Sequence, residues 1–265
     1  MKRALRLCGI VFSLMVMMLP SGTAMAAPGR IVMDLSGDKW RLWLDKKAEW
    51  MNDSLFMPPV DLGKAPVNIP TVGWDRLPDM GNPVSVPGTV EEYHWGDNGN
   101  PVGVAGDYRG VSWWSSTFTP DPDMKGKKIT LHFESVVLRA EIFVNRKLVG
   151  YDVIGNSPFA FDITGAVNFT GENRLDVRIT DPVGNFDWSN NNWYPWGKNR
   201  VPATHGFGGI NGRVLLRATD GVSIDDLYMQ NKPSFRDVEA FVTLGNATGQ
   251  EQTGNSVCSD RKSTR

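Results

Sequence analysis

The feature that most constrains the fold of this chain is a two-residue alternation of apolar and polar side chains in short segments. In residues 129–134 the odd positions hold Ile, Leu and Phe, and the even positions hold Thr, His and Glu. This is the pattern of a half-buried β-strand. Similar segments cover residues 140–144, 174–180, 213–217, 222–229 and 237–244. Turn sequences follow at the roughly 8–12-residue spacing of an all-β sandwich, and no segment has a sustained helical period, so we predict an all-β fold.

Composition excludes several classes of protein. The chain of 265 residues is 41% hydrophobic and 22% charged, which is ordinary for a globular protein and rules out wholesale disorder. Lys and Arg number 28 against 29 Asp and Glu, without blocks of like charge, so nucleic acid is not an expected partner. Because a (β/α)₈ barrel alone takes roughly 250 residues, a barrel with a second domain does not fit in this length.

The first 26 residues have the pattern of a secretory signal peptide. Lys2, Arg3 and Arg6 precede an apolar run over residues 7–19, and Ala24-Met25-Ala26 supplies the small residues of a cleavage site. The run is too short to span a bilayer, which takes about 20 residues. We therefore predict cleavage after Ala26, export to the periplasm or medium of a bacterium, and no membrane association afterwards.

The residues that usually bind metals or make disulfides are sparse. Cys8 lies in the predicted signal, which leaves Cys258 alone, so no intramolecular disulfide is expected. His94, His132 and His205 lack the spacing of metal ligands. We expect no metal and no cofactor.

Acidic residues do not single out a catalytic pair. Glycoside cleavage needs two carboxyl groups held roughly 5–9 Å apart. Glu134 and Glu141 lie in predicted strands, where a solvated surface charge is the expected role. We assign no catalytic residue to this chain.

Two groups of tryptophans stand out in the sequence. Those in strand-like segments, namely Trp40, Trp43, Trp113 and Trp114, are predicted to pack in the core.

Residues 51–110 are rich in proline and are predicted to be irregular chain lying over the sandwich.

The second group lies in a loop at residues 181–212, which is long for a compact domain and is therefore a candidate for function. Aromatic faces stack on sugar C–H groups while neighbouring polar side chains bind the hydroxyls. Two interpretations stay open: the loop binds sugar, or its rings pack the loop onto its own sandwich or a neighbouring domain. The candidate sugar-binding residues in the loop are Asp187, Trp188, Asn192, Trp193, Tyr194 and Trp196.

Several segments together resemble the N-terminal sugar-binding domain of family 2 glycoside hydrolases, the family of β-galactosidases, β-glucuronidases and β-mannosidases. Each motif is weak alone, but their order and spacing across about 130 residues are specific. They are Ser85–Thr89 (SVPGT), Gly110–Phe118 (GVSWWSSTF), Leu131–Asn145, Lys147–Gly150, Ser157–Thr164, Gly171–Arg178 and Gly208–Ile210.

The resemblance implies a jelly-roll-like β-sandwich of the galactose-binding type over residues 27–220. Residues 221–265 would then be the start of an immunoglobulin-like domain with a disordered polar tail. In that family a catalytic barrel with two glutamates follows, so the resemblance implies a chain that stops before the barrel and is inactive alone. Asp181 matches the place of an aspartate that reaches toward the substrate in β-galactosidases.

The partners implied by the resemblance are the oligosaccharide or glycoside substrate of the parent enzyme and the missing immunoglobulin-like and barrel domains. Two other functions remain open. The chain could be a stand-alone secreted carbohydrate-binding module, or a structural or assembly fragment without affinity for sugar.

Overall fold

The computed structural model describes residues 4–5, 30–57, 59–97, 108–182, 193–196, 198–202, 207–234 and 237–253. The chain divides into two compact units. Unit 2 covers Ile31–Ala218, and unit 1 comprises Met1–Arg30 and Thr219–Arg265. Each unit is described by itself.

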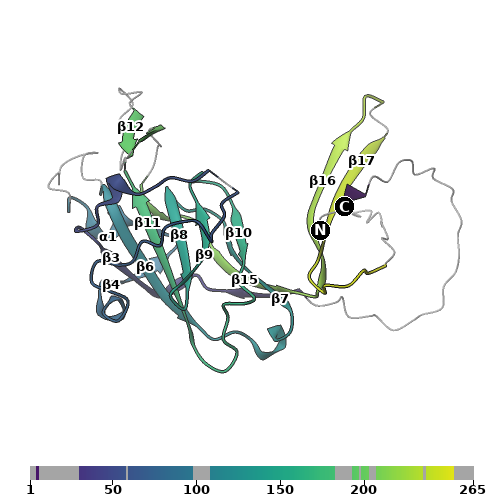
Figure 1. Cartoon of the computed structure of the whole chain (residues 1–265), viewed down its shortest axis with the longest axis horizontal. Coiled ribbons are helices and arrows are strands. Elements are labelled where there is room, and N and C mark those ends of the chain that lie inside the picture. The colour runs from purple at the N-terminus through teal and green to yellow at the C-terminus, as the bar shows by residue number, and fades with distance from the viewer. Residues whose placement is uncertain are drawn as a thin grey trace, which may run out of the picture. The chain divides into compact units, whose positions relative to one another are not determined.

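Unit 2 is a β-sandwich of two antiparallel sheets, which confirms the predicted fold class (Figure 1). The larger sheet runs in the order β4 (Asn82–Val86), β3 (Gly37–Leu44), β6 (Gly110–Phe118), β11 (Asn173–Asp181), β8 (Arg139–Val144) and β9 (Lys147–Asp152). The smaller sheet runs in the order β10 (Phe159–Asp162), β7 (Lys128–Phe133), β15 (Val214–Thr219) and β2 (Ile31–Asp34).

Smaller elements complete the unit. Two short strands, β5 (Gly88–Thr89) and β14 (Gly209–Ile210), pair with each other, and β12 (Trp193–Trp196) pairs with β13 (Asn199–Pro202). The helices are short: α1 (Val90–His94), η1 (Trp50–Asn52), η2 (Leu77–Asp79) and η4 (Pro122–Met124).

The core between the two sheets follows from the alternation in the sequence. Leu175, Val177 and Ile179 of β11 face Ile129, Leu131 and Phe133 of β7 in one cluster of buried side chains. Each such buried side chain contributes about 1.5–3 kcal/mol relative to exposure. The turn between β8 and β9 is tight because Asn145 and Arg146 both adopt positive φ, as a two-residue hairpin requires.

A third layer covers the outer face of the larger sheet. It is formed by residues 45–81, which we call the covering segment. Trp74 of this segment meets Trp113 and Phe143 of the sheet with ring centroids 5.5 and 5.0 Å apart. Trp113 and Trp114 are neighbours on β6 and point to opposite faces, yet both are fully buried. The larger sheet is therefore buried on both sides.

The structure confirms core positions for the strand tryptophans and modifies the prediction for residues 51–110. Trp40, Trp113 and Trp114 are at most 1% exposed, and Trp43 is partly buried. The covering segment is mostly irregular as predicted, but residues 82–94 form β4, β5 and α1. Pro83 fits in β4 because β4 is an edge strand, where one side of the backbone has no partner strand.

The prediction of a solvated Glu141 is wrong. Its side chain is 1% exposed and pairs with Arg178 at 2.6 Å and with Arg139 at 3.2 Å. Both arginines also reach Asp53 of the covering segment, at 2.7 and 2.8 Å. Alternation correctly placed Glu141 on the outer face, but that face lies beneath the covering segment and not in solvent.

Unit 1 contains a long hairpin of β16 (Val222–Asn231) and β17 (Val238–Asn246), and β1 (Ala4–Leu5) pairs with β17. The two long strands lie where the sequence predicted residues 222–229 and 237–244. The pairing register of the hairpin shifts between Ile224 and Asp226. Because of this shift, the apolar side chains before and after it lie on the same face of the hairpin. That face carries Val222, Ile224, Leu227, Met229, Val238, Ala240, Val242 and Leu244.

Candidate functional site

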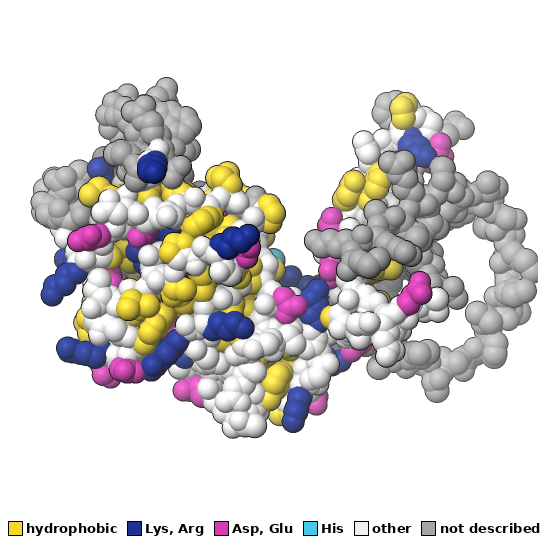
Figure 2. All heavy atoms as spheres, viewed as in Figure 1, with side chains coloured by type: hydrophobic (Ala, Val, Ile, Leu, Met, Phe, Trp, Pro, Cys, Tyr) yellow, Lys and Arg dark blue, Asp and Glu magenta, His cyan; other side chains and the backbone are white. Residues whose placement is uncertain are grey.

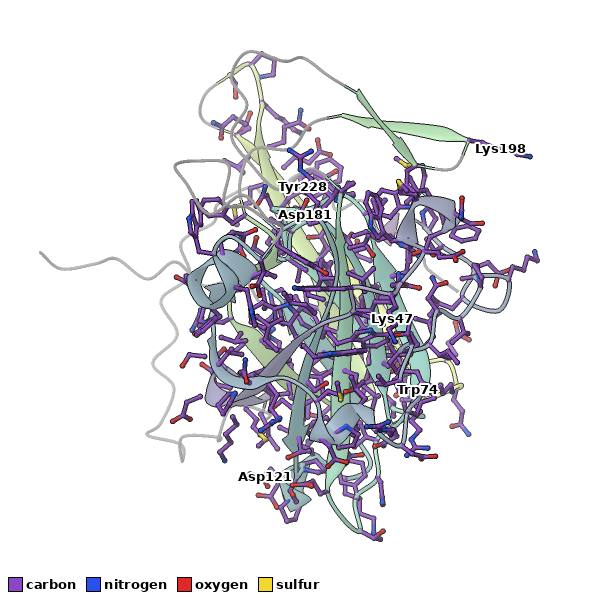
Figure 3. All side chains as sticks on the ribbon, turned by 90° about the vertical axis from the view of Figure 1, so that its left-hand side faces the viewer. Lys47, Trp74, Asp121, Asp181, Lys198 and Tyr228 are labelled. Atoms are coloured by element: carbon purple, nitrogen blue, oxygen red, sulfur yellow. The ribbon has the colours of Figure 1, made fainter. Side chains whose placement is uncertain are left out.

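The site predicted around Asp181 lies at one end of the larger sheet of unit 2. Asp181 is the last residue of β11 and pairs with Gly110, the first residue of β6. Figure 3 shows Asp181 and Asp121 at opposite ends of the sandwich, with Lys198 beyond the Asp181 end. The end of β11 and the start of β6 therefore lie together at this end of the sheet.

Local packing fixes the carboxyl group of Asp181. By the alternation of β11, Asp181 points to the same side as Val177 and Ile179, and its residue is only 3% exposed. A Cβ atom at Gly208 would lie 2.7 Å from Asp181 Oδ2, so the backbone of Gly208 packs directly against this carboxyl group. Glycine at position 208 is what allows that approach.

The segment that carries Gly208 is tied to α1. The amide of Val90 donates to the carbonyl of Gly208 at 2.8 Å, and Gly209 pairs with Thr89 across β14 and β5. Thr89 caps α1 through a reciprocal capping box with Glu92. Gly209 has a φ of 149°, and a Cβ there would come within 2.5 Å of the carbonyl oxygen of Gly88. The sequence thus needs glycine at 209 to bring α1 against the end of β11.

A small cavity of about 220 Å³ opens beside this end of the sheet. It is smaller than the roughly 300–1,000 Å³ of typical small-molecule sites, so it suits part of a ligand and not a whole oligosaccharide. Its lining combines carboxylates, cations and one indole, namely Asp45, Lys46, Ala48, Trp50, Asp97, Tyr108, Arg109 and Gly110.

Two of the lining groups are held by the fold. Asp45 is 1% exposed and accepts hydrogen bonds from Thr71 and from the indole of Trp113 at 3.2 Å. The hydroxyl of Tyr108 donates to the carbonyl of Val111 at 3.0 Å. Burial raises the pKa of Tyr108, and the charge of Asp45 raises it further, so the phenol stays neutral. Lys46, Asp97 and Arg109 are the other charged residues of the lining.

Aromatic side chains border the same region. Trp95 follows α1 and is 42% exposed, and its ring meets the ring of Phe207 at 5.9 Å and nearly a right angle. Phe207 immediately precedes Gly208, which packs on Asp181. Trp95 and Asp181 are therefore linked through the neighbouring residues Phe207 and Gly208. Trp95 contacts Phe207, and Gly208 packs on Asp181.

The hairpin of β12 and β13 is anchored at Trp196. This ring is fully buried and meets Trp50 edge-on, with centroids 5.6 Å apart. The guanidinium group of Arg139 lies 5.5 Å from the centroid of Trp196 and 5.2 Å from that of Tyr151. The ring of Trp196 thus packs within unit 2, as expected if the rings of this loop pack it onto its own sandwich. Contact between this loop and sugar stays a prediction.

The other predicted residues are placed as follows. Trp193 and Tyr194 belong to β12, of which the structure gives the backbone pairing with Pro202 and Val201. Asp187, Trp188 and Asn192 lie outside the described residues. Of the candidates, the structure brings Asp181 and Trp196 to the region where β11 ends and β8 begins, since Arg139 pairs with Thr180.

Sequence reasoning missed Trp95, Phe207 and the charged residues of the cavity. One signal was present: Trp95-Gly96-Asp97 sits outside any alternating strand, as Asp187-Trp188 does. An aromatic residue in such a place has no strand to pack in, which favours a surface role.

Neither a metal centre nor a membrane span is found in the part of the chain that the structure describes. His, Cys, Asp and Glu side chains there form no group of three or more suited to a metal ion. Among the same residues, no helix has the length and apolar character needed to cross a membrane.

Comparison with known proteins decides the family. Residues 60–195, about half of the chain, match the profile of glycosyl hydrolases family 2, sugar binding domain. The chain belongs to glycosyl hydrolase family 2. The match covers residues 60–81 of the covering segment, β4 to β11 and the start of the hairpin of β12 and β13, which confirms the resemblance seen in the sequence.

Two relatives each match a little under half of the chain. A β-galactosidase of Thermoanaerobacter pseudethanolicus is 35% identical over 128 residues, which is 46% of this chain and 16% of the relative. A β-glucuronidase of Formosa agariphila is 33% identical over 124 residues, 44% of this chain and 12% of the relative. The chain thus matches less than a fifth of the length of these relatives.

Solved structures show the same fold. A β-glucuronidase of Ruminococcus gnavus superposes with a TM-score of 0.57 at 18% identity, over 85% of this chain and 35% of that one. A family 2 glycosyl hydrolase of Bacteroides cellulosilyticus gives a TM-score of 0.54 at 20% identity, over 82% and 25%. At these identities the likeness concerns the fold alone.

Proposed function

We propose that this chain is the non-catalytic, sugar-binding part of an exported family 2 β-glycosidase, and that it contacts the glycoside at the Asp181 end of the sandwich. The observation that carries the proposal is the convergence of Asp181 and the charged cavity at one end of the larger sheet, joined through Gly110. Family membership supports a glycoside as the ligand, because the matched domain is described as sugar binding.

The chemistry of the cavity suits a sugar. Sugar hydroxyls both donate and accept hydrogen bonds. Carboxylates of the lining can accept from them, and its cationic side chains can donate to them. Trp50 adds an apolar face to the same lining. The ligand classes that the relatives suggest are β-galactosides and β-glucuronides, the substrates in their names.

Hydrolysis is not part of the proposal for this chain alone. The resemblance assigns catalysis to two glutamates of a barrel, and the described residues are strands and short helices without a barrel. Export rests on the signal-peptide pattern of residues 1–26, and detection of a mature protein beginning at Ala27 in the periplasm or medium would test it.

Binding is tested with the purified chain and methyl β-D-galactoside, lactose and methyl β-D-glucuronide, by ligand-observed NMR and calorimetry. We expect millimolar binding of at least one sugar and a loss of at least fivefold on Asp181→Asn. Asp121→Asn, at the opposite end of the sandwich, is the matched control and should bind as the parent does. Absence of binding to all three sugars would overturn the proposal in favour of a purely structural domain.

Catalysis is tested separately with aryl β-galactosides and aryl β-glucuronides. We expect no release of the aryl group above blank at catalytic concentrations of the chain. Turnover that survives repeated purification would contradict the non-catalytic assignment.

A further inference from the structure

The two carboxylates of the cavity lining differ in how far a ligand can reach them. Asp45 is 1% exposed, and both of its oxygens already accept hydrogen bonds, one from the Thr71 hydroxyl and the other from the Thr71 amide and the Trp113 indole. The side chain of Asp97 is 40% exposed and lines the same cavity. Asp97 is therefore the carboxylate that a ligand in the cavity can contact.

Asp97 is held in place although its side chain reaches solvent. Nδ1 of His94 lies 2.7 Å from Oδ2 of Asp97, and because a carboxylate oxygen only accepts, Nδ1 carries the hydrogen and donates it. The Asp97 amide donates to the His94 carbonyl at 3.2 Å, and Nζ of Lys46 donates to the Asp97 carbonyl at 3.4 Å. Within the described part of the chain, Oδ1 of Asp97 makes no hydrogen bond. One oxygen thus orients the carboxylate, and the other can accept from a ligand.

The ring of His94 has no second polar role among the described residues. Its side chain is 15% exposed, and its Nε2 atom is buried without a hydrogen-bond partner there. A buried polar atom without a partner costs stability, so an apolar side chain would occupy this place more favourably. Proteins keep costly groups of this kind where function needs them. The hydrogen bond from Nδ1 to Asp97 is therefore the contact that accounts for a histidine here.

Helix α1 fixes the position of His94, its last residue. The Val90 amide in the first turn donates to the Gly208 carbonyl at 2.8 Å. Glu91 of the same helix accepts a hydrogen bond from the Tyr108 amide at 3.0 Å, and Tyr108 lines the cavity. The helix thus sets the imidazole in a fixed place relative to the cavity wall. A binding group held in this way loses little side-chain freedom when a ligand arrives.

We propose that Asp97 accepts a hydrogen bond from a hydroxyl group of the glycoside in the cavity, and that His94 is the residue that positions it. This inference rests on the proposed function, because it requires that the cavity contact sugar. Neither residue is among those that the sequence predicted for sugar binding. Because an ionised carboxylate only accepts, the part of the sugar at Asp97 is a hydroxyl group and not the carboxylate of a uronide.

The first test is Asp97→Asn in the full chain. The probes are the one of lactose, methyl β-D-galactoside and methyl β-D-glucuronide that the parent binds most tightly, and its monodeoxy analogues. We expect Asp97→Asn to weaken binding of the complete sugar at least fivefold, as measured by ligand-observed NMR. The analogue that lacks the hydroxyl at Asp97 should bind the parent and the variant equally, because the contact is already missing. Asp121→Asn, at the opposite end of the sandwich, is the matched control and should bind as the parent does.

The second test separates positioning by His94 from a purely structural role. His94→Leu removes the donor to Asp97 together with the unpartnered Nε2 atom, so it should weaken binding at least fivefold while urea unfolding shows a protein at least as stable as the parent. His94→Asn keeps an N–H donor and should restore binding to within about twofold of the parent. A loss of stability in His94→Leu that His94→Asn does not reverse in binding would overturn the positioning role.

The outcomes distinguish this inference from the proposed function. Equal affinity of the parent and Asp97→Asn for the complete sugar would overturn the inference and leave the proposed function standing. The same holds for an equal loss with every deoxy analogue, since no hydroxyl would then be coupled to Asp97. A parent chain that binds none of the three sugars would instead overturn the proposed function, and this inference with it.

Discussion

At the scale of single residues, four charged side chains between the larger sheet and the covering segment neutralise one another. Arg139 and Arg178 come from neighbouring strands, and Asp53 and Glu141 each form ion pairs with both of them. Burial of an unpaired charge is far more costly than burial of a pair, because the remaining partner keeps its desolvation penalty. Loss of any one of the four side chains should therefore leave a charge in this set uncompensated and destabilise the protein.

Replacement of Arg178 by Met tests this dependence. The change leaves Glu141 and Asp53 with Arg139 as their only cation, and should lower the free energy of unfolding by about 3–5 kcal/mol. Urea unfolding followed by tryptophan fluorescence gives the value. Arg146→Met is the matched control, because Arg146 pairs with Asp75 where the side chains are 51% and 89% exposed, and should cost less than about 1 kcal/mol. Equal effects of the two changes would refute the argument.

Two carboxyl groups should give stability opposite dependences on pH. Burial raises the pKa of Asp152 above 3.8, against the opposing effect of the Gly155 and Ile154 amides. A raised carboxyl pKa means that the folded state binds the proton more tightly, so stability falls as pH rises from the unfolded pKa through the folded one. Asp152→Asn should therefore stabilise the protein more at pH 7 than at pH 3, as measured by urea unfolding at both values.

Glu134 should give the opposite dependence of stability on pH. The hydrogen bonds from Arg213 hold the pKa of this carboxyl below 4.5. Its contribution is present above the unfolded pKa and is lost as pH falls through the folded pKa. Glu134→Gln should thus reduce stability at pH 7 and have less effect at pH 3. The same pH trend for both variants would contradict these assignments.

At the scale of elements, the alternation predicted the strands of both sheets but not what lies over them. β7, β8, β11, β15, β16 and β17 occupy the segments that the two-residue period indicated. β4 was missed because Pro83 argues against a strand, and α1 because five residues are too few to show a helical period. Glu141 was misjudged because a period assigns a residue to a face without saying whether another layer covers it.

The pairing of β5 with β14 should depend on glycine at 209. A Cβ there would meet the backbone of Gly88 and Thr89 at 2.5–2.8 Å, and φ is 149°. We expect Gly209→Ala to destabilise the protein by more than about 1 kcal/mol, since backbone strain and a backbone clash combine. Gly165→Ala, where a Cβ meets nothing within 4 Å, should be close to neutral in the same urea titration.

The hairpin of unit 1 has one apolar face, and its side chains are open to solvent. Ile224 and Met229 are 65% and 64% exposed, while the other face carries the stacked rings of Tyr228 and Phe241. Exposed apolar patches bind hydrophobic dyes and promote association. Ile224→Lys and Met229→Lys should therefore lower the fluorescence of a bound naphthalene sulfonate dye and reduce light scattering. Ser223→Lys, on the opposite face, should do neither.

At the scale of the whole molecule, the sequence predicted the family and the all-β class, and both are confirmed, while Asp181 as a site residue stays a prediction. The residues that line the cavity come from positions 45–50, 97 and 108–110, and the segment that packs on Asp181 comes from positions 207–208, far apart in the chain. No spacing rule links them, because their proximity is set by the strand order and by the contact between α1 and Gly208. Sequence motifs were enough to indicate the family. Which residues lie near one another could be seen only in the folded structure.

The covering segment has a second, outward surface. Figure 2 shows hydrophobic side chains among Lys and Arg on this side of unit 2, and Met51, Met57, Val67 and Ile69 of the segment are 54–78% exposed. The segment thus joins a buried polar network on its inner side to an apolar outer side.

The neutral set of Asp53, Glu141, Arg139 and Arg178 limits how this domain can change in evolution. A substitution of Asp53 alone leaves one positive charge uncompensated, and a substitution of either arginine alone leaves one negative charge uncompensated. Viable sequences must then alter these positions together, or replace the whole set with apolar residues in concert. Among family 2 domains with this covering segment, we expect the four positions to co-vary as a block, although they come from a segment and strands some 90 to 125 residues apart.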